Sequence, residues 1–237
     1  QKSGAGRLTK KFSPTLLAFL TITGLISLIL NYQSDISTLG IIILSGVLMY
    51  FASSTPLWHT VLIILAGTAG LISFIKLAPY RSDRLFVLLN PGADPMGKGF
   101  QIKQALITVG SGGIFGLGLG MSRQKFGFLP QSMNDSIFAV FSEETGFLGA
   151  VILVALFLLF FWRGIKIAKN SADKFSKFAA LGISFWIIFQ TFVNMSSMIG
   201  IFPLSGVPLP FFSYGGSHLI SEMAGLGILL KISRKNN

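Results

Sequence analysis

The chain has no cysteine, only two histidines, and eight acidic residues against 19 lysines and arginines. Without cysteine, neither a disulfide framework nor a thiolate metal site can form, and His59 and His218 are too few and too scattered for a zinc site. Charged residues make up only 11% of the chain, whereas 51% are hydrophobic and the mean hydropathy is +0.71. This balance excludes an ordinary soluble domain and indicates an integral membrane protein.

The apolar residues form blocks that approach the roughly 20 residues of a membrane-spanning helix. A membrane barrel would instead show apolar and polar alternation over segments of about ten residues, so strands are the weaker alternative. We therefore predict an all-α, polytopic helical bundle, a single membrane domain over 1–237. Its six spans are predicted at about 15–32, 37–53, 57–78, 146–163, 178–199 and 217–232, with a long external segment at 79–145 that contains re-entrant or interfacial helices.

Lysine and arginine collect before the first span, between the fourth and fifth spans, and after the sixth. Six spans place all three stretches on one side, which the positive-inside rule assigns to the cytoplasm. Topology thus explains most of the net charge of +11, and nucleic-acid binding is a poorer interpretation. The external segment carries six further basic residues that favour an anionic partner: Arg81, Arg84, Lys98, Lys103, Arg123 and Lys125.

Three of the eight carboxylates, those of Asp135, Glu143 and Glu144, lie within ten residues just before the fourth predicted span. Such clustering in so apolar a chain indicates chemistry. The simple alternative for Asp135 is a helix N-cap, because Asp is favoured there and an apolar run follows. For Glu144, a solvated position at the membrane surface is as good an interpretation as holding a metal or positioning Asp135.

Five motifs follow one another in order. They are Gln33-Ser-Asp-Ile-Ser-Thr, Pro79-Tyr-Arg, Ser122-Arg-Gln-Lys, Asp135-Ser-Ile-Phe-Ala-Val and Ser213-Tyr-Gly-Gly-Ser. Together they resemble the SEDS family of peptidoglycan polymerases, FtsW, RodA and SpoVE, and FtsW most of all. Members of that family have ten spans, so the resemblance implies that this chain corresponds to spans five to ten and lacks the first four. We also expect, from the missing initiator Met, that the chain starts within a longer protein.

The resemblance implies an inverting glycosyltransferase that polymerises lipid II at the outer face of the bacterial cytoplasmic membrane, at the division septum. Asp135 matches the family's catalytic aspartate, and a divalent cation (Mg or Mn) is implied, with Asp135 and Glu144 as candidate ligands. A carboxylate suits the reaction, because it can take the proton of the attacking sugar hydroxyl while a lipid diphosphate leaves. The implied partners are a class B penicillin-binding protein, other division proteins and membrane lipids, with no nucleic acid.

Candidate substrate-binding residues lie in or beside the matched motifs: Arg81, Lys125, Gln124, Glu144, Ser213 and Tyr214. Basic side chains would hold the diphosphate, although lipid headgroups or solvent are the simpler partners of any single one. The chain departs from the family pattern at Gln131, Met133, Asn134 and Ser136, which keeps a non-catalytic division scaffold open. A lipid II flippase, which would also need basic groups for the diphosphate, is the other alternative.

Three further features carry predictions. The six glycines between 110 and 120 are interpreted as allowing close packing of a re-entrant or surface-lying segment rather than cradling phosphate. Asp35 is expected to cap the second span. Glu222 follows His218 by four positions in the last span, and a local His–Glu pair is favoured over a proton relay. Family members usually carry a small or apolar residue at both of these places.

Overall fold

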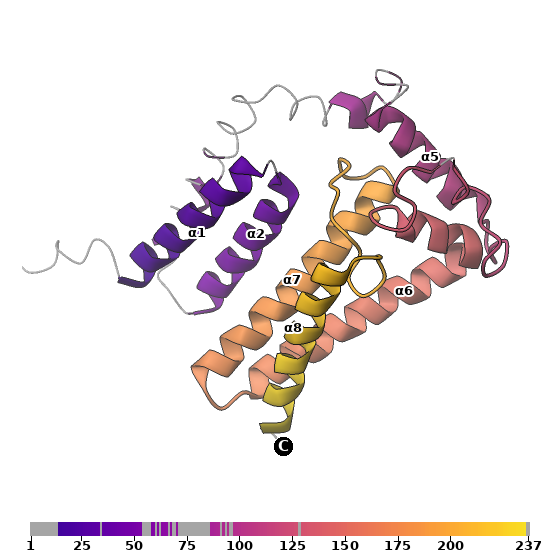
Figure 1. The fold of residues 1–237 in the computed structure, drawn as a ribbon. Helices are drawn as coiled ribbons and strands as arrows, with labels where there is room; N and C mark the ends of the chain where they lie inside the picture. The colour runs from indigo at the N-terminus through magenta and orange to yellow at the C-terminus, as the bar shows by residue number, and fades with distance from the viewer. Residues whose placement is uncertain are drawn as a thin grey trace, which may run out of the picture.

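The computed structural model describes residues 14–33, 35–53, isolated positions between 58 and 70, 86–90, 92, 94, 97–127 and 129–235. Within these residues the extended regular elements are all α-helices (Figure 1). The predicted all-α fold is confirmed. The third predicted span falls mostly outside the described residues, and Arg81 and Arg84 lie outside them as well.

The first two helices form a pair that contacts α7 through its second member. Helix α1 (Pro14–Tyr32) and helix α2 (Ile36–Ala52) agree with the first two predicted spans to within one residue at each end. The side chain of Asp35 accepts a hydrogen bond from the backbone N–H of Thr38 at 3.1 Å, which satisfies a donor in the first turn of α2. The predicted cap is therefore confirmed.

Helix α6 (Ile137–Asn170) is broken at Gly146, whose backbone has φ 70° and ψ −171°. A short helix at 137–145 thus precedes a longer apolar one that begins at 147. The longer part continues past the predicted end of the span at 163, because its basic residues are good helix formers and their aliphatic stems can lie along apolar surface. One of them, Lys166, has its Nζ 5.5 Å from the ring centroid of Trp162.

Helix α7 (Lys174–Met198) follows after a turn at 171–173, and helix α8 (Gly216–Lys235) ends the described chain. The side chain of Asp173 caps α7 by accepting the N–H of Ser176 at 2.9 Å. Lys235 Nζ at the end of α8 lies 3.3 Å from Asp173 Oδ1. The basic stretches around the α6–α7 turn and after α8 therefore share one end of the bundle, as the charge pattern predicts.

Helices α6 and α7 are both long and apolar enough to cross a membrane. In α6 only 17% of the most apolar stretch is buried, and large side chains such as Leu156, Leu159 and Trp162 are exposed. The core helix of a soluble protein would bury these side chains. Their exposure means that lipid or other helices cover them, in agreement with the predicted membrane location.

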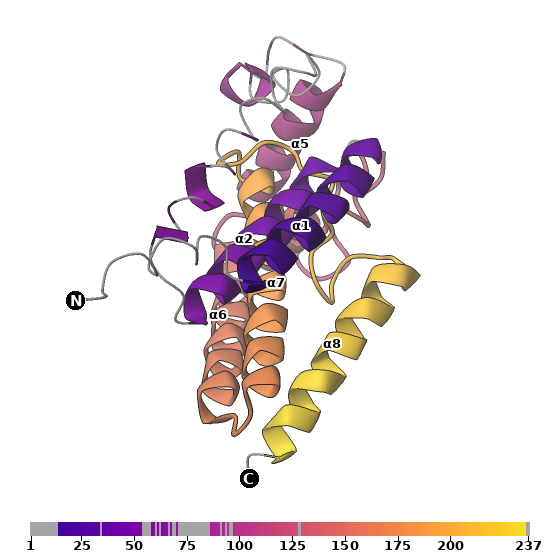
Figure 2. The same cartoon turned by 90° about the vertical axis from the view of Figure 1, so that its left-hand side faces the viewer.

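Helix α5 (Lys98–Ser111) packs against α6 and α7 at the end of the bundle opposite the α6–α7 turn (Figure 1). The larger apolar core lies here and combines residues of α5, α6, α7 and the loop that follows α7, among them Ile102, Phe138, Ile187 and Leu209. Figure 2 shows that loop running from the outer end of α7 to the start of α8. By the positive-inside rule, this end of the bundle faces the outside.

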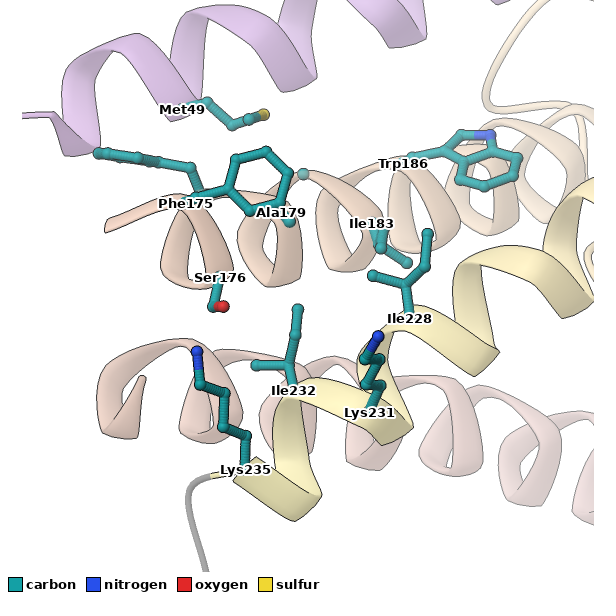
Figure 3. A pocket seen from close by; sticks show the side chains of 12 residues that line it. Met49, Phe175, Ser176, Ala179, Ile183, Trp186, Ile228, Lys231, Ile232 and Lys235 are labelled. Atoms are coloured by element: carbon teal, nitrogen blue, oxygen red, sulfur yellow. The ribbon is translucent and has the colours of Figure 1, made fainter. Parts of the chain in front are cut away.

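A pocket of about 590 Å³ opens near the other, basic end, between α2, α7 and α8 (Figure 3). Its lining is largely apolar and includes Met49, Ile183 and Trp186, together with Lys231 and Lys235. None of the sequence-predicted site residues lines it. This pocket is therefore separate from the candidate site, whose described residues lie at the opposite end of the bundle.

Candidate active site

The break in α6 receives the backbone of the glycine-rich loop after α5. Four hydrogen bonds of 2.8 to 3.1 Å join the two segments: Leu117 and Gly118 N–H donate to the carbonyls of Glu143 and Glu144, and Phe147 and Leu148 N–H donate to those of Gly113 and Ile114. A Cβ at Gly146 would lie 2.3 Å from the nitrogen of Gly116, and one at Gly116 would lie 2.2 Å from the oxygen of Glu144. Only glycine permits this approach, so the close-packing interpretation is confirmed for Gly116, and for Gly112, whose added Cβ would lie 2.2 Å from the oxygen of Ser142.

Glu143 is buried at the centre of this junction. Its carboxylate accepts hydrogen bonds from Ser111 Oγ at 3.1 Å, from Ser122 Oγ, and from the backbone N–H of Gln124 at 3.5 Å. Because these donors come from the end of α5 and from the segment after the glycine loop, the carboxylate ties both to α6. The Glu143 carboxylate therefore makes its hydrogen bonds inside the protein and has a structural role.

Glu144 forms an ion pair with Lys125, in which Glu144 Oε1 and Lys125 Nζ are 2.8 Å apart. Desolvation raises the pKa of the Glu144 carboxyl, but hydrogen bonds from Lys125 and from the backbone at Gly120 and Ser122, together with the positive charge of Lys125, bring it below its ordinary value. The lysine also donates to the carbonyl of Gly120 at 2.8 Å. The two predicted substrate contacts thus neutralise each other here, and their role toward substrate stays a prediction.

Gln124 lies in the same segment. Its side-chain Oε1 is buried and has no hydrogen-bond donor within the described part of the chain. A buried acceptor without a donor is costly, which leaves Gln124 with unused capacity for a hydroxyl or amide of a bound molecule. Arg81, which was also predicted to bind the substrate, lies outside the described residues.

Asp135 lies two residues before Ile137, the first residue of α6. The N-cap residue is Ser136, and no side chain makes a capping hydrogen bond there. The alternative of a capping role for Asp135 is therefore wrong. Its half-buried carboxylate has no hydrogen bond or ion pair with any other described residue, and burial raises the pKa of this carboxyl above its ordinary value of 3.8.

The loop after α7 borders this carboxylate and holds the backbone beside it. A Cβ at Gly206, whose φ is 68°, would lie 3.6 Å from Asp135 Oδ2. Three bonds of 2.7 to 3.0 Å end on successive carbonyls before α6: Tyr214 N–H donates to Met133, Ser213 Oγ donates to Asn134, and Asn194 Nδ2 donates to Asp135. The position of Asp135 is thus set through main-chain atoms, and its carboxylate has no hydrogen-bond partner within the described ranges.

Asn194 was missed by sequence reasoning. It is fully buried in α7, and its Nδ2 also donates to the carbonyl of Val207 at 2.8 Å, so that it links the loop to Asp135. The available signal was an amide side chain inside an apolar span, where a polar group needs a specific partner. Gln190, one helical turn earlier, carries the same signal.

Ser213 and Tyr214 were predicted to touch the substrate, and that contact stays a prediction. Ser213 is buried, and its hydroxyl accepts the N–H of Leu209 at 2.7 Å in addition to donating to Asn134. Its capacity is therefore used to hold the loop. The Tyr214 side chain is 80% exposed, so its hydroxyl is free to face a molecule outside the fold.

Backbone strain also marks this region. Gln131, one of the departures from the family pattern, has φ 49°, in the left-handed region that residues other than glycine rarely adopt. Its carbonyl accepts the N–H of Asn134 at 3.0 Å and that of Ser136 at 3.3 Å, which closes the turn before α6. Strained positions of this kind gather where a scaffold has to present a side chain in a fixed place.

The predicted pair of metal ligands, Asp135 and Glu144, is not assembled in this structure. Seven helical positions separate Ile137 from Glu144, about 10 Å along the axis at 1.5 Å per residue, and Glu144 is bound to Lys125. No group of three or more His, Asp or Glu side chains suited to a metal occurs among the described residues. These residues do not form a preassembled cation site, and the cation remains an expectation drawn from the resemblance.

His218 and Glu222 interact through charge but share no direct hydrogen bond or ion pair, so the predicted local pair does not form as a direct contact. His218 Nε2 lies 3.0 Å from the carbonyl oxygen of Ser213, whereas Glu222 accepts from the N–H of Phe211 at 2.8 Å and from Gln190 Nε2 at 3.3 Å. Both side chains bind the loop after α7, because that loop folds back over the start of α8 and offers backbone partners.

Comparison with known proteins decides the family. Residues 3–237 match the family described as cell cycle protein, which comprises FtsW, RodA and SpoVE. The chain belongs to this family. Stage V sporulation protein E of Bacillus subtilis (strain 168) is 42% identical over 207 residues, which are 87% of this chain and 57% of that protein. A probable peptidoglycan glycosyltransferase FtsW of Pseudoalteromonas translucida (strain TAC 125) is 40% identical over 227 residues, 94% of this chain and 56% of that protein.

Solved structures of the family share the fold. A peptidoglycan synthase complex that coordinates polymerization and crosslinking contains a chain with a TM-score of 0.70 and 27% identity, matched over 93% of this chain and 60% of that one. A mutant of the rod shape-determining protein RodA of Thermus thermophilus has a TM-score of 0.59 and 25% identity, over 93% and 55%. The predicted family and its polytopic membrane fold are confirmed, and the chain spans less than two thirds of the length of these relatives.

Proposed function

We propose that the intact protein is a peptidoglycan glycosyltransferase that polymerises lipid II at the outer face of the cytoplasmic membrane. The observation that carries this proposal is the carboxylate of Asp135, which is half-buried and has no partner in the described part of the chain. The positive-inside rule assigns the basic α6–α7 turn to the cytoplasm. Asp135 lies at the opposite end of the bundle, which the rule therefore assigns to the outside. Lipid-linked precursors are consumed on that side.

The reaction needs a base, and Asp135 has the properties of one. Its carboxylate takes the proton of the acceptor sugar hydroxyl, whose oxygen attacks the anomeric carbon of the donor. The bond from that carbon to the lipid diphosphate breaks, and the diphosphate leaves with the electron pair. One displacement inverts the α-linked donor sugar into a β-linked strand. The raised pKa makes this carboxylate a stronger base than one in water.

The hydrogen bonds around Asp135 support this role, because a general base must be placed before the substrate arrives. The bonds from Asn194 and Ser213 end on main-chain carbonyls and hold the segment without engaging the carboxylate. Such preorganisation lowers the barrier by removing the search for a reactive geometry. A divalent cation, Mg or Mn, stays part of the proposal on the strength of the resemblance alone.

Partners and cellular place extend the same proposal. Similarity to a chain of a synthase complex that coordinates polymerization and crosslinking supports assembly with a class B penicillin-binding protein. Similarity to proteins named FtsW supports work at the division septum during cell wall synthesis, together with other division proteins. Exposed apolar residues on α6 offer surface for membrane lipids and for helices of such partners.

The test uses the intact protein purified from membranes and fluorescent lipid II. The wild type is expected to form glycan polymer, and Asp135→Asn to form it about 10² to 10⁴ more slowly. Asp173→Asn is the matched control, because it makes the same chemical change in a carboxylate at the opposite end of the bundle and should retain activity. Transfer of lipid II between leaflets by the wild type and by Asp135→Asn alike, with no polymer formed by either, would overturn the proposal in favour of a flippase. Complementation of a deletion strain by Asp135→Ala would overturn it in favour of a scaffold.

A further inference from the structure

Glu222 is a fully buried carboxylate in α8 that the proposed reaction does not use. Its Oε2 accepts the backbone N–H of Phe211 at 2.8 Å, and its Oε1 accepts from Gln190 Nε2 at 3.3 Å. Gln190 Nε2 also donates to the carbonyl of Pro208 at 3.0 Å. The two side chains together hold both ends of the turn at 208–211. A buried carboxylate persists where such partners compensate for its lost hydration.

The turn that Glu222 holds is strained at its end. Phe211 has φ 62°, in the left-handed region, where the Cβ of an L-residue crowds the following carbonyl. A bulky side chain stays there only when its surroundings over-determine the conformation. Here the N–H of Phe211 is fixed by Glu222, and its ring packs against Phe160 with a centroid distance of 6.2 Å.

The same turn continues by hydrogen bonds to the segment that carries Asp135. The N–H of Leu209 donates to Ser213 Oγ at 2.7 Å, and Ser213 Oγ donates in turn to the carbonyl of Asn134 at 2.7 Å. One hydroxyl is thus shared between the turn and the residue before Asp135. If the turn relaxes, this hydroxyl moves, and the backbone at Asn134 loses its donor.

We propose that Glu222 is a positioning residue for Asp135, which acts through Phe211 and the turn at 208–211. It touches neither substrate nor reacting atoms, and its contribution is to keep the turn in the strained form that presents the Ser213 hydroxyl to Asn134. The inference rests on the proposed polymerase function for its kinetic consequence. Its structural part, the coupling of Glu222 to the segment 133–136, stands independently of that function.

Three variants of the intact protein test this role. Glu222→Leu keeps the volume and removes both acceptors. Glu222→Gln is the conservative variant, because it keeps an acceptor for the N–H of Phe211. Leu229→Ala is the matched control, since Leu229 is buried in the same helix but packs in a separate apolar cluster, with Ala180 and Ile232. Turnover and KM with fluorescent lipid II, thermal unfolding, and amide hydrogen exchange of 133–136 and 207–214 are measured for each.

Glu222→Leu is expected to lower kcat by about tenfold to 100-fold with KM within about twofold, and to raise amide exchange in both segments. Glu222→Gln should recover most of kcat, and Leu229→Ala should lower thermal stability without lowering kcat. An unchanged kcat in Glu222→Leu, or an equal fall in Leu229→Ala, would overturn the inference. If the wild type forms no polymer, the proposed function fails, and amide exchange alone decides: unchanged exchange at 133–136 in Glu222→Leu then overturns the coupling.

Discussion

Asp135 and Glu143 lie eight residues apart in one acidic stretch, yet their carboxylates have opposite environments. Glu143 is buried and accepts hydrogen bonds from Ser111, Ser122 and Gln124. Asp135 is half-buried, and its carboxylate has no partner among the residues described. The difference shows that hydrogen-bond satisfaction, and not membership of an acidic cluster, separates a carboxylate that builds the site from one that is available to react.

The largest expected effect separates activity from stability. Asp135→Asn should lower the polymerisation rate by about 10² to 10⁴, the usual contribution of a general base. Its midpoint of thermal unfolding should stay near that of the wild type, because the carboxylate makes no hydrogen bond or ion pair with the part of the chain that the structure describes. Turnover of fluorescent lipid II and thermal unfolding of the same preparation measure the two quantities. A large loss of stability with intact turnover would reverse the assignment of the two carboxylates.

The junction that surrounds Glu143 should be sensitive to a single methyl group. Gly146→Ala is expected to cost about 3 kcal/mol in the free energy of unfolding, because an alanine at φ 70° is strained and its Cβ meets the backbone of Gly116. Gly227→Ala is the control, since nothing lies within 4 Å of its added Cβ. Thermal unfolding in detergent measures both. Equal stabilities of the two variants would show that the glycine loop does not pack into α6.

Removal of the Glu143 carboxylate should destabilise the fold. Glu143→Ala is expected to cost about 2 kcal/mol, since it leaves the buried hydroxyl of Ser122 without its acceptor. Glu144→Ala removes a partly exposed ion pair with Lys125 and should cost less than about 1 kcal/mol. Thermal unfolding of the two variants ranks them. The reverse order would mean that the ion pair, rather than the buried carboxylate, holds the junction.

The smallest effect concerns pH. Burial raises the pKa of Asp135, and a general base works in its deprotonated form, so kcat/KM should fall as pH drops through that raised pKa, by about tenfold per unit below it. Above this pKa the rate should level off. A pH–rate profile of the wild type measures this fall in kcat/KM at low pH. The residual rate of Asp135→Asn should show no such fall. A profile that falls only near the ordinary pKa of aspartate would contradict the effect of burial.

Much of the architecture could be predicted from composition and order. Runs of apolar residues give the first two helices to within a residue, and the basic stretches place the α6–α7 turn and the end of α8 together. The extension of α6 on both sides of its predicted span was not foreseen. Hydropathy reports where lipid could begin and end, whereas a helix continues as long as its residues favour it.

The central residue of the candidate site could be predicted from the sequence, but the residues that hold it in place could not. Asp135 could be found because a sequence motif carries it. The roles of Asn194 and Glu222 depend on the loop after α7, which supplies backbone partners for both side chains or for the segment they hold. No local sequence pattern predicts where this loop lies. The expected pair of His218 and Glu222 does not form as a direct contact for the same reason: spacing along a helix gives neighbours on one face, while the third partner comes from elsewhere in the fold.

The donors from Asn194, Ser213 and Tyr214 end on peptide oxygens, an atom that every amino acid supplies. The Met133 side chain takes no part in this attachment and is exposed, and the Asn134 side chain is likewise exposed. Substitution at these two positions can therefore change the exposed surface beside Asp135 while the position of Asp135 is kept. Main-chain attachment of the segment tolerates such change, which explains how Met133 and Asn134 can depart from the family pattern.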